Sequence, residues 1–192
     1  MTRRSALLLV PVAALIAAVP LAQTVTTKVK KRGNAIREYE DDRIHAVVAY
    51  EYSNRYHSGA WIFVDAAIRT TDNLVFDRSD FTLLTPAENT VTLGEQPRFI
   101  QDAKQITRIR QNARIWNRDL NSYFVDKTTN TTYRLFALPG DGVTTDSIVT
   151  DAHGAASVTL YFESPSRSWP DGTYQLKIDN RKARAVIPIE LN

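Results

Sequence analysis

The chain has 192 residues, enough for one folded domain with its own core. It contains no cysteine, which excludes disulfides, thiolate metal sites, a cysteine nucleophile and a lipid attached through an N-terminal cysteine. The formal net charge is +3, but six of the 24 basic residues lie before residue 33, which leaves 18 basic against 21 acidic residues. We therefore predict a mildly acidic folded body and expect no nucleic acid partner.

Residues 1–22 have the composition of an export signal. Two arginines precede an apolar run from Ala6 to Ala22, and small residues lead to a cleavage site after Ala22. We predict export to the periplasm of a bacterium or to the extracellular space. The alternative is an uncleaved anchor, the only membrane contact we expect, because the run approaches the length of the shortest membrane helices. Pro11 and Pro20 count against such a continuous helix.

The segment after the leader, residues 23–34, is basic from Lys28 to Arg32. We predict a solvated tether here, with contact to an anionic lipid or polymer as the alternative. The folded domain is then expected to occupy residues 35–192.

The first part of this domain has the alternation of β-strands. Apolar residues alternate from Arg43 to Tyr52, and a turn at 53–59 leads to a second apolar, β-branched run at 60–70. These two strands are predicted to form a hairpin. A third strand is expected within residues 74–85, where Pro86 ends it.

The segment from Pro97 to Leu120 has a different period. Its apolar residues are spaced by three or four, which is typical of a helix with one apolar face. The alternative is a pair of twisted strands broken near Gln111 and Asn112. The residues that carry the helical spacing are Ala103, Ile106, Ile109, Ala113, Trp116 and Leu120.

The remaining chain returns to β-structure. Residues 121–138 are predicted to form a hairpin, residues 139–154 a loop, and three strands follow within 155–164, 173–179 and 183–191. Pro188 marks the last as an edge strand. About eight short strands, without helices alternating between them, predict an immunoglobulin-like antiparallel β-sandwich with one inserted α-helix.

Two segments resemble a small immunoglobulin-like domain of exported bacterial proteins, catalogued as a domain of unknown function. The first is Trp61–Pro86, where an apolar strand, a polar turn and a strand opening with Ser-Asp-Phe follow one another. The second is Gly154–Ile178, with a strand ending in Phe162 and a proline three residues later. They cover about a quarter of the chain. The resemblance implies an exported sandwich and implies no catalytic residue.

Few residues point to chemistry. His45, His57 and His153 are far apart in the sequence and are predicted to be structural or exposed. Aspartates recur every five residues in the predicted loop, at Asp141, Asp146 and Asp151, in a spacing that favours turns over a Ca²⁺ site. We predict no metal site, no cofactor and no catalytic residue.

The predicted helix carries a basic face beside an aromatic residue. We predict a non-enzymatic exported binding or structural module that contacts an unknown envelope or extracellular protein. The alternative is polyanion or glycan binding through segment 97–124. A third hypothesis is an enzyme with a site assembled across loops. The candidate binding residues are Arg108, Arg110, Arg114, Trp116 and Arg118.

Overall fold

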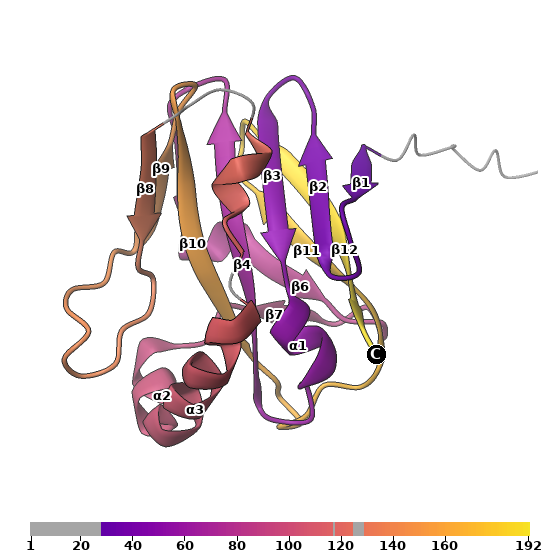
Figure 1. The fold of residues 1–192 in the computed structure, drawn as a ribbon, viewed down its shortest axis with the longest axis vertical. Coiled ribbons are helices and arrows are strands. Elements are labelled where there is room, and N and C mark those ends of the chain that lie inside the picture. The colour runs from indigo at the N-terminus through magenta and orange to yellow at the C-terminus, as the bar shows by residue number, and fades with distance from the viewer. Residues whose placement is uncertain (1–27, 117, 125–128) are drawn as a thin grey trace, which may run out of the picture.

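The computed structural model describes residues 28–116, 118–124 and 129–192 (Figure 1). The described chain is mostly β, with several antiparallel sheets in an arrangement compatible with a β-sandwich. The predicted export signal lies outside the described residues and stays a prediction. In the part of the chain that the structure covers, no helix has the length and apolarity needed to cross a membrane.

The larger sheet has six strands in the order β1-β2-β3-β4-β10-β8. Neighbouring strands are antiparallel except β8 and β10, which run parallel. The strands are β1 (Val29–Lys31), β2 (Ile36–Glu40), β3 (Ile44–Ala49), β4 (Trp61–Thr70), β8 (Thr129–Tyr133) and β10 (Gly154–Glu163).

The second sheet has four antiparallel strands in the order β12-β11-β6-β7, and a separate ribbon pairs β5 with β9. Pro188 lies in β12, an edge strand, as the sequence predicted. These strands are β5 (Leu74–Asp77), β6 (Phe81–Leu84), β7 (Thr90–Thr92), β9 (Ser147–Thr150), β11 (Gly172–Asp179) and β12 (Arg184–Leu191).

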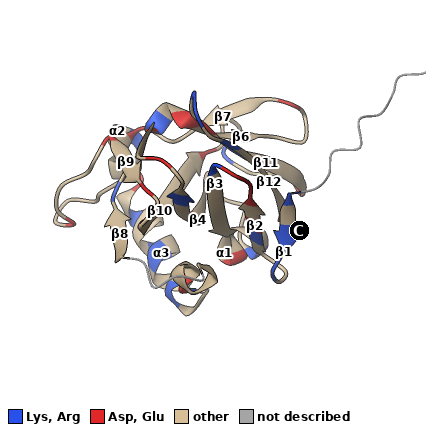
Figure 2. Cartoon of the chain, turned by 90° about the horizontal axis from the view of Figure 1, so that it is seen from above, with Lys and Arg blue, Asp and Glu red and all other residues tan. Residues whose placement is uncertain are grey.

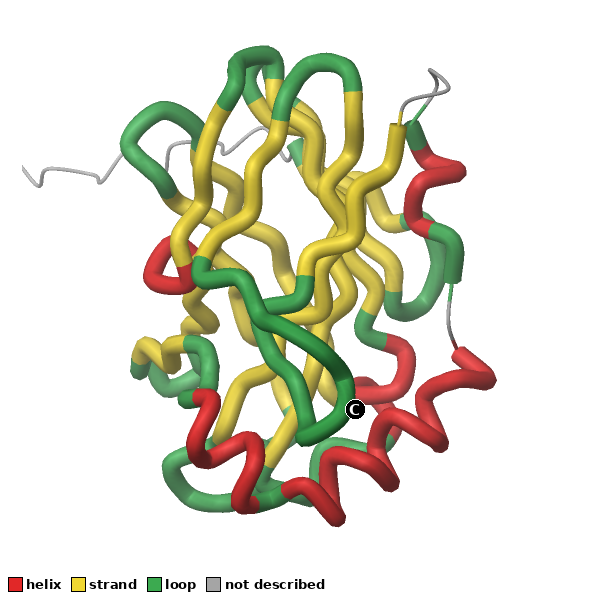
Figure 3. Tube along the Cα trace, turned by 90° about the vertical axis from the view of Figure 1, so that its left-hand side faces the viewer, coloured by secondary structure: helices red, strands yellow, loops and turns green. Residues whose placement is uncertain are grey.

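Helices lie outside the two sheets. In Figure 1 the strands β6, β11 and β12 lie behind the six-stranded sheet, while α2 and α3 lie at the lower left, below β8 and β10. Figure 3 shows from the side that the helical segments stay at the periphery of the strands. The helices are α1 (Glu51–Arg55), α2 (Gln96–Gln101) and α3 (Ala103–Ala113), with 3-10 turns η1 (Arg78–Asp80), η2 (Arg114–Trp116) and η3 (Leu120–Tyr123).

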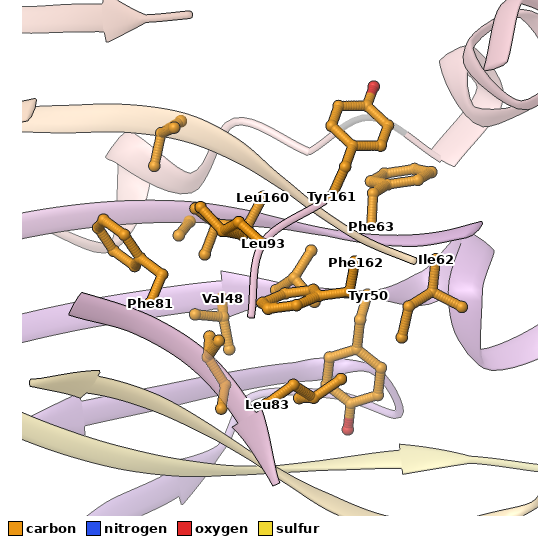
Figure 4. Packing of buried hydrophobic residues seen from close by; sticks show 14 of the residues in the cluster. Val48, Tyr50, Ile62, Phe63, Phe81, Leu83, Leu93, Leu160, Tyr161 and Phe162 are labelled. Atoms are coloured by element: carbon orange, nitrogen blue, oxygen red, sulfur yellow. The ribbon is translucent and has the colours of Figure 1, made fainter. Parts of the chain in front are cut away.

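The main core fills the space between the two sheets. Side chains alternate across each strand, so Ile62 and Phe162 point to one side while Phe63 and Tyr161 point to the other (Figure 4). Phe81 and Leu83 of β6 reach the same core from the second sheet, and both are fully buried. The larger sheet therefore has a second, outer face that also carries large aromatic residues.

The first predicted hairpin is present, but the first strand ends earlier than expected. β3 and β4 pair antiparallel, whereas residues 51–55 form α1 instead of continuing β3. The hydroxyl of Ser53 donates to the carbonyl of Phe63 at 2.7 Å and accepts from its N–H at 2.9 Å. This buried pair of hydrogen bonds fixes the helical turn against β4, which alternation alone did not indicate.

The single strand predicted within 74–85 is wrong, because the structure has two strands in different sheets. β5 pairs with β9 and β6 pairs with β11, with the 3-10 turn η1 between them. A capping box between Asp77 and Asp80 stabilises this turn and redirects the chain. The Ser-Asp-Phe sequence thus marks a change of sheet.

The hairpin predicted within 121–138 is also wrong where the chain is described. Residues 120–123 form η3, and β8 pairs in parallel with β10 rather than with a preceding strand. Gly154 permits this pairing, because a Cβ there would lie 2.6 Å from the carbonyl oxygen of Thr129. The predicted loop 139–154 likewise contains the short strand β9.

The helix expected at 97–120 is present in two pieces, and the alternative of two strands is wrong. α2 ends before Asp102, whose carboxylate accepts a hydrogen bond from the indole nitrogen of Trp61 at 2.8 Å. α3 then presents Ile106 and Ile109 to the interior, as the spacing predicted. The helix ends at Ala113, because the chain tightens into η2.

The basic segment after the leader differs from a solvated tether where it is described. Residues 29–31 form β1 and pair with β2. Lys28, Lys30 and Arg32 form ion pairs with Asp41, Glu40 and Glu38, respectively. The positive charges therefore face carboxylates of the β2–β3 region.

Candidate functional site

Two apolar patches on the outer face of the larger sheet are covered by the segment between β7 and β8. Phe99 of α2 packs over one patch, with ring centroids 4.8 Å from Tyr161, 5.0 Å from Phe136 and 5.7 Å from Trp61. η3 covers the other patch with Leu120 and Phe124. The residues of this second cluster are Ile36, Val47, Ala49, Ala67, Leu120, Phe124 and Ala155.

A polar strip crosses the sheet between these two apolar patches. Asp65 of β4 lies opposite Thr159 of β10, and the Thr159 hydroxyl donates to Asp65 Oδ1 at 2.6 Å. Ser157, two residues before Thr159, donates to Asn121 Oδ1 of η3 at 3.1 Å. Thr132 of β8 lies opposite Ser157 in the parallel register. Polar groups from four elements therefore converge on one part of the outer face.

The polar strip forms the floor of a cleft. A cavity of about 960 Å³ lies over β4, β8 and β10, and a neighbouring cavity of about 510 Å³ extends toward the end of α3. Asp65, Arg110, Thr159 and Tyr161 line both cavities, so they form the junction between them. Cavities of about 300 to 1,000 Å³ are typical of small-molecule sites.

The two titratable groups on the floor of the cleft resist ionisation. Burial raises the pKa of the Asp65 carboxyl, and the hydrogen bond from Thr159 opposes this shift. Burial also raises the pKa of the Tyr161 hydroxyl, which stays a neutral donor and acceptor at physiological pH. The floor thus combines a partly buried carboxyl, an alcohol and a phenol.

The wall of the cleft is formed by α3 and the loop after β8. Arg110 of α3 forms an ion pair with Asp141 of the loop. The backbone N–H of Leu138 and the charge of Arg110 lower the pKa of Asp141, which keeps this carboxylate ionised. Gly140 and Gly142 have φ of 93° and 96°, which lets the loop turn sharply on both sides of Asp141.

The structure places the five predicted binding residues in different surroundings. Arg108 and Arg114 are exposed, and Figure 2 shows basic residues along α3. Arg110 lines the cleft and forms the ion pair with Asp141. Arg118 lines the cleft and forms an ion pair with Glu51 at 3.1 Å. Trp116 is partly buried, with the guanidinium of Arg55 4.6 Å from its ring centroid.

Sequence reasoning missed Asp65, Thr159 and Tyr161. Asp65 carried a usable signal, because it interrupts a strand that is otherwise apolar from Trp61 to Ile68. An unpaired charge is costly at such a position, so its presence indicates a role beyond packing. Thr159 and Tyr161 alternate with apolar residues like any strand on a solvated face, and they carried no signal of their own.

One group of side chains has the composition of a metal site. Glu38, Glu40 and His45 offer ligand atoms that lie within 4.8 Å of one another. These atoms already have protein partners, because Glu38 binds both Arg32 and His45 while Glu40 binds Lys30 at 3.3 Å. The group is accounted for as an ion-pair network on the β2–β3 hairpin.

Two of the three aspartates of the predicted loop, Asp141 and Asp151, act on the backbone as predicted, and no hydrogen bond of this kind joins Asp146 to the described residues. Asp151 Oδ1 accepts from the backbone N–H of His153 and of Gly154, both at 2.7 Å. Asp141 Oδ2 accepts from the N–H of Leu138 at 3.0 Å. These bonds shape turns at the two ends of the segment.

Comparisons with protein-family models, with curated proteins and with solved structures find no match for this chain. The cleft is therefore the feature from which function is inferred.

Proposed function

We propose that this chain is an exported, non-enzymatic binding module and that it binds its ligand in the cleft over β4 and β10. The observation that carries the proposal is the placement of Asp65, a desolvated carboxyl on a central strand, at the junction of two cavities. Burial of a carboxyl at this position lowers the stability of the fold unless hydrogen-bond partners compensate for the lost hydration. Groups that are unfavourable in this way are typical of binding sites. Export is the part of the proposal that depends on the leader.

We further propose an immunoglobulin-like arrangement of the strands, in keeping with the resemblance of two segments to exported immunoglobulin-like domains. The order β3-β4-β10 against β12-β11-β6-β7 supports this, because it corresponds to A-B-E against G-F-C-C′ of that fold. β8 occupies the place of strand D but departs from that fold, because it runs parallel to β10. In this reading β1 and β2 extend the first sheet, and α2 and α3 are the insertion that creates the cleft.

The cleft is a better candidate than the basic face of α3. Arg110 and Arg118, two of the four arginines predicted to bind a polyanion, are already paired with Asp141 and Glu51. A polyanion would have to displace these carboxylates, which reduces its gain from binding. The floor of the cleft, by contrast, also offers the Thr132 and Tyr161 hydroxyls and Asp65 Oδ2, which a ligand reaches without displacing a hydrogen bond between described residues.

A ligand screen with a matched pair of variants tests the proposal. Asp65→Asn changes the carboxyl at the floor of the cleft, and Asp72→Asn changes an exposed aspartate in the β4–β5 turn. We expect ligands that raise the melting temperature of wild type and Asp72→Asn but have a much smaller effect on Asp65→Asn. Ligands that stabilise all three proteins equally would place binding elsewhere and refute the proposal.

A further inference from the structure

We propose that the ligand of the cleft is a neutral, hydroxyl-rich molecule, that is, a saccharide. This inference rests on the proposed function, because it assigns a chemical class to the ligand of the same cleft. Two observations support it: some charged groups around the cleft already form ion pairs, and several polar atoms are still able to form hydrogen bonds with a ligand.

Two of the arginines that line the cleft form ion pairs, and two others, Arg114 and Arg134, are exposed and form none with the described residues. Arg110 is held by Asp141, and Arg118 donates to both carboxylate oxygens of Glu51, at 3.1 and 3.3 Å. Asp119 accepts from the N–H of Asn121 at 3.0 Å, which commits it to the start of η3. An anionic ligand therefore meets unpaired positive charge only at the exposed Arg114 and Arg134, and at Arg110 or Arg118 it would have to break an existing ion pair.

The groups that remain are hydroxyls and an amide. Seven of the twenty residues that line the larger cavity carry a hydroxyl. Those with neighbouring positions in the sheet are Thr132 on β8 and Ser157, Thr159 and Tyr161 on β10. Ser157 and Thr159 already donate to Asn121 and Asp65 and keep their acceptor lone pairs. Thr132 and Tyr161 are able both to donate and to accept, so the row offers a mixture of donors and acceptors that matches a ligand whose own groups do both. Vicinal sugar hydroxyls have this property, whereas phosphates and ammonium groups do not.

Asp65 supplies the strongest point of recognition. Thr159 occupies Oδ1 at 2.6 Å, and no hydrogen bond from the described residues reaches Oδ2. Oδ2 therefore keeps its acceptor capacity for a ligand, and a ligand hydroxyl that donates to it would form a hydrogen bond to a partly buried carboxyl. A carboxyl is also able to accept from two adjacent hydroxyls at once, which favours a polyol over a ligand with a single donor.

The effect of salt on binding distinguishes a neutral saccharide from a charged ligand. Binding of a neutral saccharide releases few counterions, so its affinity changes little with ionic strength, whereas polyanion binding weakens steeply as salt is added. Salt dependence therefore separates the saccharide from the polyanion that the basic face of α3 first indicated.

The test uses the full-length chain and isothermal titration with three probes: a panel of neutral hexasaccharides (maltohexaose, cellohexaose and chitohexaose), heparin as a polyanion, and an extended serine- and threonine-rich peptide. The variants are Asp65→Asn and Thr159→Val, with Asp72→Asn as the control. We expect a neutral hexasaccharide to bind with an affinity that is insensitive to salt. Both cleft variants should lower this affinity at least about tenfold, while the control leaves it unchanged.

The alternative outcomes separate the two proposals. If heparin or the peptide binds and the cleft variants abolish that binding while no saccharide binds, the cleft is the binding site but the saccharide inference is wrong. If a saccharide binds equally well to wild type and to both cleft variants, or if no probe binds, both proposals are overturned. Circular dichroism of each variant establishes that a loss of affinity is not a loss of fold.

Discussion

Replacement of Phe99 by alanine tests whether α2 is held on the sheet by aromatic packing. The ring is 1% exposed and contacts Trp61, Phe136 and Tyr161 at centroid distances of 5.7 Å or less. Truncation of a buried phenylalanine costs about 3 to 5 kcal/mol, because transfer free energy is lost and a cavity remains. Typical domains have about 5 to 15 kcal/mol in total, so we expect a folded but clearly weakened protein.

The adjacent residue provides a matched control. Ile100 lies on the same helix and is 42% exposed, so Ile100→Ala should change the free energy of unfolding by less than about 1 kcal/mol. Both variants are measured by urea unfolding, followed by tryptophan fluorescence and circular dichroism. Equal effects of the two substitutions, or a cost below about 1 kcal/mol for Phe99→Ala, would refute the packing of α2 described above.

Three further substitutions test other features. Gly94→Ala places a Cβ 2.3 Å from the Trp61 ring, so urea unfolding should show a loss of about 1 to 3 kcal/mol, and unchanged stability would contradict this close contact. Gly154→Ala should push β8 from β10 and speed amide exchange of residues 129–133; wild-type exchange rates would argue against the parallel pairing. Asp65 has a folded pKa raised by burial, so wild type should lose stability relative to Asp65→Asn as pH rises from about 4 through that pKa. Urea unfolding of both proteins across this pH range tests the prediction, and pH profiles of equal slope for the two proteins would contradict it.

The helical segment between β7 and β8 shows which structural features the local spacing of apolar residues predicts and which it does not. The spacing of Ile106 and Ile109 predicted a helix with one buried face, and the structure confirms it. The spacing did not indicate the break at Asp102, a residue whose carboxylate contacts Trp61, 41 residues away. Periodicity reports which face of an element is buried, and it does not report which distant residue contacts the element.

The hairpin errors have a common cause. Alternation near Tyr123 and Tyr133 was taken for two strands of one hairpin, but Tyr123 belongs to η3 and Tyr133 to a strand paired in parallel with β10. A parallel partner is distant in sequence, so turn signals give no information about it. The same limit concealed β9, which pairs with β5 across the chain.

The sequence by itself determined the mostly β character, the burial of one helix face, the edge position of Pro188 and the turn-forming role of the loop aspartates. These features depend on neighbours within a few residues, where side-chain period and backbone chemistry act directly. The cleft was decided only by tertiary structure. Asp65, Arg110 and Thr159 meet because β4, α3 and β10 pack together, and the ion pairs of Arg110 and Arg118 form between segments that no local pattern connects.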